Sequence, residues 1–475
     1  IMVKYKATFT GDYNRIKFAG YYTNEHPYNY FAALCTVGNS KLNNSEILYS
    51  YQDGVHIVTD DEVIIQNTII DGSAYNNIFI DKFKEFNSRV VLENNVLMNA
   101  LDNGLVINQH GSSSISVKNN IIKDNTNAGI VIEGHDDGGF DITDNKIINN
   151  GSYPIIIVLD EIKSSVVFNC ASENEYIGNK AADYVMITGF VNEDLTLVEG
   201  TYVYENIFVL EEKVFTILPG TVLLGYQFSG FMIIAGKLVA EGTKEDPIVF
   251  TSIQDELYGG KGVKSVNDRW YGIAVVETGE FRGDYVEVRY GGFSGYWYDG
   301  YDNNLYNYRN NNEIKAISPC LILSYGKLYL CNSLLQDSSQ EGIILINSNA
   351  TILNSIIEGS QSDNIRIGSL DTPAPAILKE KEFEKFDAME SEDKTEELIV
   401  NIQNNIIQYA GGYGININKN DSGNLIIENN KIENTNIPVR VCLSAIKTED
   451  GIEKILNNEF RDNRSFDYLY LEQYA

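Results

Sequence analysis

The chain has 475 residues, of which 43% are hydrophobic, and its formal net charge at pH 7 is −30. This acidic excess disfavours negatively charged partners such as nucleic acid or an anionic membrane surface, whereas a neutral ligand or a cation would meet no repulsion. No apolar run approaches the length of a membrane span, and five scattered cysteines without a C-x-x-C spacing favour neither a disulfide framework nor a zinc site.

Residues 1–60 are rich in tyrosine and do not show the repeat that follows them. We predict an N-terminal cap here, because the open end of a stack of strands exposes unpaired strand edges. Ile1 precedes Met2, so we expect the chain to be a fragment whose signal peptide or anchor is missing.

A unit of about 25 residues recurs from residue 61 onward and is clearest between Val117 and Val158. Each unit holds short Val/Ile runs, which are typical of strands, separated by Asn, Asp and Gly, and such a period is typical of a solenoid. The recurring asparagines are Asn67, Asn95, Asn120, Asn145, Asn332, Asn354, Asn405, Asn430 and Asn458. An asparagine at one corner tolerates left-handed backbone, and its carboxamide can bond along the stack. We therefore predict one parallel β-helix over residues 61–475.

A different cassette occupies residues 200–292. It contains Leu-Pro-Gly-Thr at 218–221, Trp-Tyr-Gly-Ile at 270–273 and Arg-Tyr-Gly-Gly at 289–292. This cassette resembles one found in right-handed parallel β-helices of bacterial secreted and surface proteins, where Pro-Gly starts a turn and Trp-Gly-Ile opens a strand. The resemblance implies an all-β, pectate-lyase-like solenoid and a secreted or cell-surface location.

Two long loops are predicted to interrupt the second half of the solenoid. Residues 293–312 are aromatic and polar with almost no aliphatic residue, and residues 371–399 are strongly charged. Between Lys379 and Glu397 the second loop has nine acidic residues and four lysines, which is typical of a solvated loop or a short amphipathic helix.

The sequence offers little for catalysis, although β-helices host many polysaccharide lyases and hydrolases. Gly134-His135-Asp136-Asp137-Gly138 superficially resembles pieces of β-helical pectin hydrolases, but their separate Asn-Thr-Asp, Asp-Asp, Gly-His-Gly and Arg-Ile-Lys segments are not found. A turn explains this motif, and Asp136 and Asp137 could hold a structural calcium ion. We predict no catalytic residue and no required cofactor. The alternative is a polysaccharide lyase or glycoside hydrolase with an unrecognised carboxylate pair or calcium site.

The aromatic residues indicate carbohydrate binding. The chain has 31 Tyr against 20 Phe, and the 293–312 loop holds several of them with almost no aliphatic residue to pack behind them. Tyr and Trp present a flat apolar face and a polar tip, which suits stacking on sugar rings. The predicted carbohydrate-binding residues are Trp270, Tyr271, Tyr296, Trp297, Tyr298, Tyr301, Tyr306 and Tyr308. A tyrosine-rich loop that folds back over the solenoid wall is the structural alternative.

An acidic, tyrosine-rich β-helix of this kind is similar to the tāpirins, the cell-surface cellulose-binding proteins of extremely thermophilic cellulolytic bacteria. The likeness rests on overall make-up and on the cassette at residues 200–292, and it implies a non-catalytic adhesin that attaches a cell to cellulose or a related plant cell-wall polysaccharide. It also implies a thermophilic source. A structural surface-layer or protein-adhesion module that binds no glycan is a third hypothesis.

Overall fold

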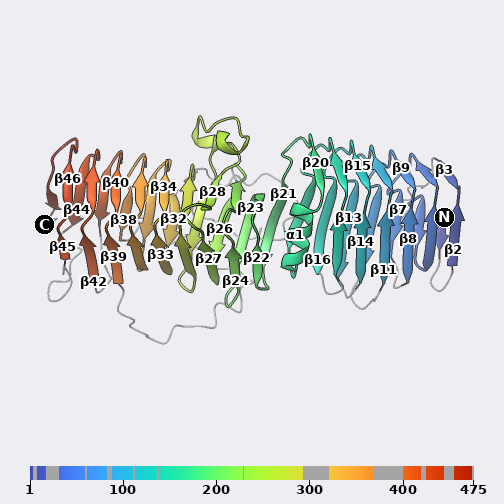
Figure 1. Cartoon of the computed structure of the whole chain (residues 1–475), viewed down its shortest axis with the longest axis horizontal. Coiled ribbons are helices and arrows are strands. Elements are labelled where there is room, and N and C mark those ends of the chain that lie inside the picture. The colour runs from blue at the N-terminus through green and yellow to red at the C-terminus, as the bar shows by residue number, and fades with distance from the viewer. Residues whose placement is uncertain are drawn as a thin grey trace, which may run out of the picture. The chain divides into compact units, whose positions relative to one another are not determined.

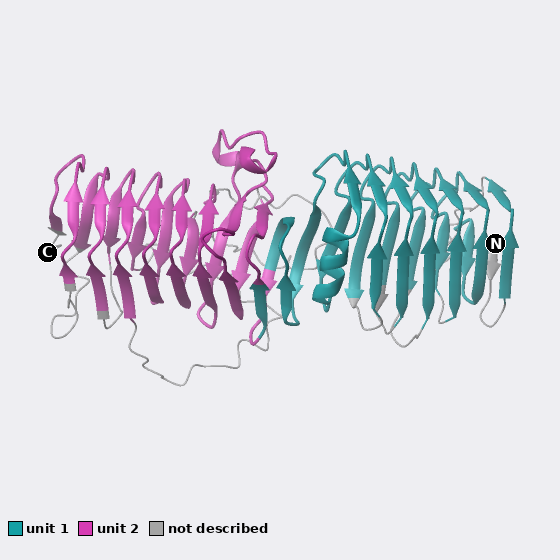
Figure 2. Ribbon diagram, in the orientation of Figure 1, with its two compact units in different colours: residues 1–207, 213–216 teal, residues 208–212, 217–475 magenta. Residues whose placement is uncertain are grey.

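The computed structural model describes residues 1–3, 8–17, 32–58, 61–82, 88–110, 113–135, 139–227, 229–292, 320–368, 399–418, 424–442 and 454–472. They form two compact units, residues 1–207 with 213–216, and residues 208–212 with 217–475 (Figure 2). In each unit the strands stack in parallel, three to a turn of the chain, as Figure 1 shows. The predicted parallel β-helix is therefore confirmed, but as two units.

Unit 1 has three parallel walls, here called sheets 1, 2 and 3. Sheet 1 comprises β1 (Met2–Val3), β4 (Leu34–Thr36), β7 (Val55–Ile57), β10 (Ile78–Lys82), β13 (Leu105–His110), β16 (Ile130–His135), β19 (Ile155–Leu159) and β21 (Val185–Val191). Sheet 2 comprises β2 (Thr8–Asp12), β5 (Asn39–Asn43), β8 (Glu62–Gln66), β11 (Arg89–Glu93), β14 (Ser114–Lys118) and β17 (Phe140–Thr143). Sheet 3 comprises β3 (Arg15–Lys17), β6 (Glu46–Leu48), β9 (Ile69–Asp71), β12 (Val96–Met98), β15 (Ile121–Lys123), β18 (Lys146–Ile148) and β20 (Glu175–Ile177).

Unit 2 repeats this plan. Its sheet 1 comprises β26 (Phe231–Ile234), β29 (Gly272–Val275), β32 (Cys320–Ser324), β35 (Glu341–Leu345), β38 (Ile365–Ile367), β41 (Tyr413–Ile417), β44 (Ile437–Cys442) and β47 (Leu469–Glu472). Its sheet 2 comprises β27 (Lys237–Glu241), β30 (Glu280–Asp284), β33 (Lys327–Cys331), β36 (Asn349–Leu353), β39 (Ile399–Gln403), β42 (Asn424–Glu428) and β45 (Lys454–Leu456). Its sheet 3 comprises β25 (Val222–Gly225), β28 (Ile248–Ser252), β31 (Val286–Arg289), β34 (Leu334–Gln336), β37 (Ile356–Glu358), β40 (Ile406–Gln408), β43 (Lys431–Glu433) and β46 (Glu459–Arg461).

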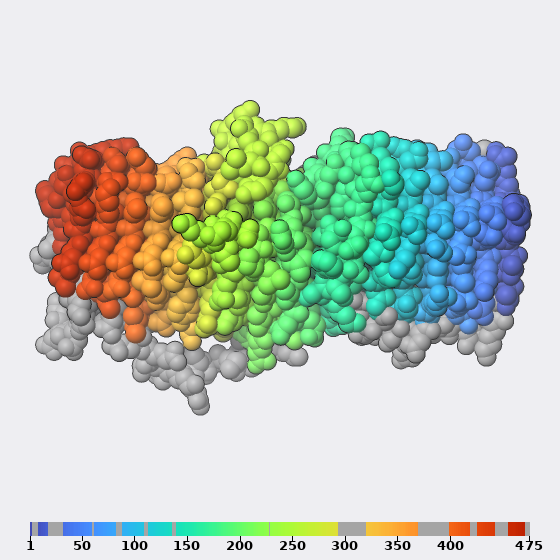
Figure 3. All heavy atoms as spheres, in the orientation of Figure 1, coloured from blue at the N-terminus to red at the C-terminus, as the bar shows by residue number. Residues whose placement is uncertain are grey.

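The remaining described elements are one α-helix, two 3-10 helices and three strands. Unit 1 also contains α1 (Ser164–Ser172) and β22 (Leu195–Leu197), while β23 (Thr201–Val209) and β24 (Val214–Ile217) cross the unit boundary. The segment between β28 and β29 carries η1 (Glu256–Tyr258) and η2 (Val266–Asp268) and projects from the body of unit 2 (Figures 1 and 3). The sequence analysis did not predict this insertion. In the described part of the chain, no helix is long and apolar enough to cross a membrane.

The core follows from strand geometry. Successive side chains of a strand point to opposite faces, so in β11 Val90 and Leu92 are buried while Arg89 is exposed. In sheet 3 of unit 1, whose strands are three residues long, the middle residue points inward, as Ile70 and Ile122 do. Parallel stacking places these aliphatic residues in rows, which is why the repeat shows in the sequence as short Val/Ile runs.

The predicted asparagine corner is formed by two adjacent residues with different roles. At the first corner, between sheets 2 and 3, Asn94 and Asn119 have φ values of 57° and 55°, whereas the following Asn95 and Asn120 are buried. Asn67 is one of the residues with left-handed backbone, since its φ is 51°. The prediction that Asn67 and Asn95 are equivalent is therefore wrong by one residue, because Thr68 occupies the buried position.

The buried asparagines form a ladder along this corner. Asn120 Oδ1 accepts hydrogen bonds from the backbone N–H and Nδ2 of Asn95, at 2.9 and 3.0 Å. Its own Nδ2 donates to the carbonyl of Leu92 at 2.9 Å and to Asn145 Oδ1 at 3.0 Å. In unit 2 the same ladder runs through Asn405, Asn430 and Asn458. Each carboxamide thus satisfies buried backbone groups that the turn leaves without a partner.

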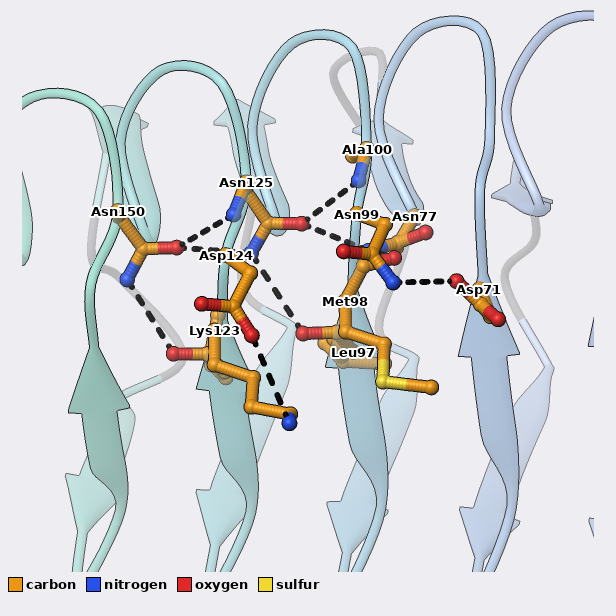
Figure 4. A network of polar contacts seen from close by, with 11 residues as sticks. Asp71, Asn77, Leu97, Met98, Asn99, Ala100, Lys123, Asp124, Asn125 and Asn150 are labelled. Atoms are coloured by element: carbon orange, nitrogen blue, oxygen red, sulfur yellow. Dashed lines mark hydrogen bonds and ion pairs between the residues drawn. The ribbon is translucent and has the colours of Figure 1, made fainter.

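A second ladder lies at the second corner, between sheets 3 and 1. Asn150 Oδ1 accepts from Asn125 Nδ2 at 2.9 Å, but the next position is Ala100 (Figure 4). Asn77, on a neighbouring rung, points its Nδ2 into this space and donates to Asn125 Oδ1 at 3.0 Å and to the Met98 carbonyl at 3.1 Å. Asn77 therefore supplies the amide that Ala100 lacks. Unit 2 has the same arrangement. Asn364 Nδ2 donates to the Gln408 carbonyl at 2.8 Å, and Ala410 follows Gln408 by two residues, as Ala100 follows Met98.

This compensation predicts strong coupling between positions 77 and 100. Asn77→Gly should lower the free energy of unfolding by about 2 kcal/mol, because two buried acceptors lose a donor. Ala100→Asn alone should cost about 1–3 kcal/mol through overpacking. The double variant should recover most of both losses, since Asn at position 100 then restores the ladder. Denaturant unfolding of the four proteins tests this, and additive losses would contradict it.

Residues 1–60 do not form a separate cap in their described part. Thr8 aligns with Asn39 between β2 and β5, and Ser40 aligns with Val63 between β5 and β8, so these strands belong to sheet 2. The number of residues between aligned positions differs from 25 here, because the connections between strands vary in length. This variation hides the repeat in the sequence. The boundary that the structure does show lies near residues 207–217 instead of residue 60.

The predicted second long loop falls between two strands that stack directly on each other. Ala350 of β36 pairs directly with Val400 of β39, so the extra residues between them are an insertion into one rung. The loop residues 369–398 themselves lie outside the described residues.

Candidate functional site

Most of the predicted site residues lie outside the part of the chain that the structure describes. These are Tyr296, Trp297, Tyr298, Tyr301, Tyr306 and Tyr308 of the aromatic loop, and Asp136 and Asp137 of the calcium hypothesis. Their roles stay predictions from the sequence.

Trp270 and Tyr271 are described, and the expectation that they bind carbohydrate is wrong. Trp270 is 0% exposed, and its Nε1 donates to the Arg289 carbonyl at 2.7 Å. Its ring fits where Gly225 has no side chain, because a Cβ there would lie 2.7 Å from the Trp270 Cβ. Tyr271 packs edge-on against Phe231 with a centroid distance of 6.4 Å, and burial raises the pKa of its hydroxyl. Neither ring has a free face for a ligand.

A different set of aromatic residues is exposed at the second corner of unit 1. Tyr49, Tyr51, Tyr75 and Leu101 are 47%, 58%, 55% and 68% exposed, respectively. We call these four residues the tyrosine corner. The backbone N–H of Tyr75 donates to Gln52, and that of Leu101 donates to Ser73, so the four residues lie on three consecutive rungs.

The tyrosine corner is held in place by its own backbone. Tyr49 has a φ of 57°, and its ring lies across Gly72 of the next rung, where an added Cβ would come within 2.8 Å of Tyr49 Cδ1. Gly72 has a φ of 74°, which favours glycine, so the same residue makes the turn and leaves room for the ring. The tyrosine corner is therefore an exposed group of side chains on three neighbouring rungs.

The sequence analysis placed Tyr49 and Tyr51 in the predicted cap and did not single out Tyr75. Their positions in the repeat could have identified them. Each of these tyrosines follows a three-residue strand of sheet 3 and precedes the next strand of sheet 1. Other exposed tyrosines, namely Tyr13, Tyr409 and Tyr468, lie at other corners and rungs.

A histidine and two carboxylates meet where the second corner enters sheet 1 of unit 1. His56 Nδ1 lies 3.4 Å from Asp53 Oδ2, and His56 Nε2 lies 3.9 Å from Asp81 Oδ2. Asp53 Oδ1 also accepts from the N–H of Asn76 at 3.0 Å. The His56 side chain is only 1% exposed, so a polymer at the surface does not contact it. This cluster ties neighbouring rungs together.

A second polar cluster lies on sheet 1 of unit 2. Glu341 Oε1 is 3.3 Å from Arg366 Nη1, while Asp363 accepts from the Tyr413 N–H at 2.9 Å and from Asn416 Nδ2 at 2.7 Å. Burial raises the pKa of both carboxyl groups, and Arg366 opposes this effect. Perturbed pKa values mark either functional sites or structural networks. Here each carboxylate bonds to neighbouring residues of its own wall, which favours the structural role.

No metal centre is found among the residues with described positions, since no three His, Cys, Asp or Glu side chains there could hold an ion together. The free cysteines Cys35, Cys170 and Cys320 are buried, and burial raises the pKa of each thiol. They behave as small apolar residues, as expected for buried thiols.

Comparison with known proteins supports the fold. Residues 10–171 match the family model described as a right handed beta helix region. The match covers about a third of the chain, within unit 1, and supports the resemblance to right-handed parallel β-helix proteins. No curated protein and no solved structure matches the chain. The resemblance to the tāpirins therefore has no counterpart among these comparisons.

Proposed function

We propose that this protein is a non-catalytic adhesin that binds an insoluble, uncharged polysaccharide, with cellulose as the first candidate. The observation that carries the proposal is the tyrosine corner, in which exposed aromatic rings lie on consecutive rungs. Rungs of a β-helix rise by about 4.8 Å, and Tyr75 lies one rung along the stack from Tyr49 and Tyr51. Exposed rings on neighbouring rungs can stack on sugar rings of one polymer chain.

The electrostatics favour an uncharged ligand. The chain carries a formal net charge of −30, which would repel a polyanionic polysaccharide. The tyrosine corner needs no charge to act, because ring faces and phenolic hydroxyls recognise neutral sugars. The resemblance to the tāpirins points to the same ligand class and to the surface of a bacterial cell, where such a protein would link the cell to plant biomass.

The test is a triple substitution at the tyrosine corner, Tyr49→Ala, Tyr51→Ala and Tyr75→Ala, assayed by depletion from solution on microcrystalline cellulose. Each ring contributes about 0.5–1.5 kcal/mol beyond its buried area, so we expect binding to weaken by about 10-fold to 1,000-fold. The matched control replaces Tyr13, Tyr409 and Tyr468 with alanine, which removes three exposed tyrosines elsewhere. Thermal unfolding of both variants checks their folding.

Three other results would each support a different site or function. Equal weakening by both triple variants would exclude a specific site at the tyrosine corner. Loss of binding only on replacing Tyr296, Trp297, Tyr298 and Tyr301 would move the site to the aromatic loop. Release of soluble reducing sugar or unsaturated uronate from cellulose, xylan or pectin would replace the adhesin with the lyase or hydrolase hypothesis.

A further inference from the structure

The outward face of sheet 3 in unit 1 has an ordered arrangement of charge. The first residue of each of its seven strands points outward, and the backbone register aligns these residues in one row. The row reads Arg15, Glu46, Ile69, Val96, Ile121, Lys146 and Glu175. Three aliphatic residues therefore lie at its centre, and a pair of opposite charges lies at each end.

The row is self-complementary about Val96. Reversing its direction places Glu46 opposite Lys146, Arg15 opposite Glu175 and Ile69 opposite Ile121, while Val96 meets itself. Here every charged position meets the opposite sign.

The parallel row at the ends of the same strands has the same property at its centre. Asp71, Met98 and Lys123 are aligned in the register of β9, β12 and β15, as Figure 4 shows. On reversal, Asp71 faces Lys123 and Met98 faces itself. Two independent rows thus share one centre of symmetry, which lies on β12.

We propose that two copies of this chain associate face to face through sheet 3 of unit 1, around a two-fold axis that runs parallel to β12. Such an axis keeps the strand direction and reverses the stacking direction, so β12 packs on β12 of the second copy, β9 on β15, β6 on β18 and β3 on β20. Identical patches then meet, as in an isologous dimer. Sheets that pack face to face lie about 10 Å apart, a distance that these side chains span.

The charges on this face are available for such contacts. Arg15 pairs with Glu46 at 2.8 Å and Lys146 with Glu175 at 2.7 Å, but all four side chains are more than two-fifths exposed. Exposed ion pairs contribute little to stability, so rearranging them costs little. In the dimer each end becomes a network of four alternating charges, while Ile69, Val96 and Ile121 leave water.

The equivalent face of unit 2 is a poorer candidate. Five consecutive residues of its first row are also self-complementary, namely Glu287, Leu334, Ile356, Ile406 and Lys431. Its second row, however, has Glu358 at the centre, aligned between Gln336 and Gln408. A two-fold axis there would bring Glu358 against its own copy, and like charges at a contact oppose association. Unit 1 has no such conflict.

A charge-swap experiment on the full chain tests the proposal. Sedimentation velocity over a range of concentrations should show a monomer–dimer equilibrium. Glu46→Lys alone, or Lys146→Glu alone, should weaken the dimer by about tenfold or more, because the symmetry turns two attractive contacts into two repulsive ones. An equimolar mixture of the two single variants should associate as the wild type does, since each repulsive surface then meets its complement. The double variant should also recover.

Controls make every outcome decisive. Lys118→Glu reverses an exposed charge on sheet 2, where Lys118 pairs with Asp141 at 2.5 Å, and should leave the dimer unchanged. Thermal unfolding checks that the variants fold. A monomer at every concentration, singles that associate as tightly as the wild type, or a dimer lost instead in Lys431→Glu would each overturn the proposal. The cellulose assay is a separate test, because its variants leave the charges of sheet 3 unchanged.

Discussion

Replacing Asn120 with alanine is expected to lower the free energy of unfolding by about 3 kcal/mol, because several buried polar groups lose their partner at once. The carboxamide accepts from Asn95 and donates to the carbonyl groups of Leu92 and Lys118. Water cannot replace it, since Asn120 is 1% exposed. Denaturant unfolding followed by circular dichroism measures the loss.

The neighbouring Asn119 is the matched control. It has the same side chain but a φ of 55° and no part in the buried ladder, so Asn119→Ala should cost only about 1 kcal/mol of left-handed backbone strain. Asn119→Gly should cost nothing or stabilise slightly, because glycine adopts this conformation freely. Equal losses at positions 119 and 120 would show that the corner depends on backbone conformation and not on the carboxamide ladder.

Replacing Trp270 with alanine should be still more costly, by about 4 kcal/mol, since it empties a fully buried aromatic site in unit 2. The Arg289 carbonyl would also lose its Nε1 donor. Thermal or denaturant unfolding measures this effect. The residue's place in the cassette made it a candidate for sugar binding, so the experiment separates a structural role from a binding role.

Trp270→Phe provides that separation. It keeps most of the ring volume and removes only the hydrogen bond, so its expected cost is about 1–2 kcal/mol and the protein stays folded. This folded variant should bind cellulose as the wild type does. A selective loss of binding at unchanged stability would return Trp270 to the binding site.

The repeat could be predicted from the sequence because its physical cause is local. A short strand with an inward aliphatic residue, a left-handed residue and a buried polar residue recur along the stack, and stacking places equivalent positions in register. The position of individual asparagines could not be predicted as well. Asn94 and Asn95 are adjacent and chemically identical, and only the contacts with the next rung decide which one turns the backbone and which one is buried.

The sequence by itself determined the parallel β-helix, the corner asparagines and the insertion between β36 and β39, because strand periodicity and turn chemistry act over neighbouring residues. Only the tertiary structure decided which aromatic residues reach solvent. Trp270 lies in an interior space opened by Gly225, whereas Tyr49, Tyr51 and Tyr75 come together at one corner from successive rungs. Burial and adjacency of this kind depend on the register between rungs more than 20 residues apart, and no local pattern records that register.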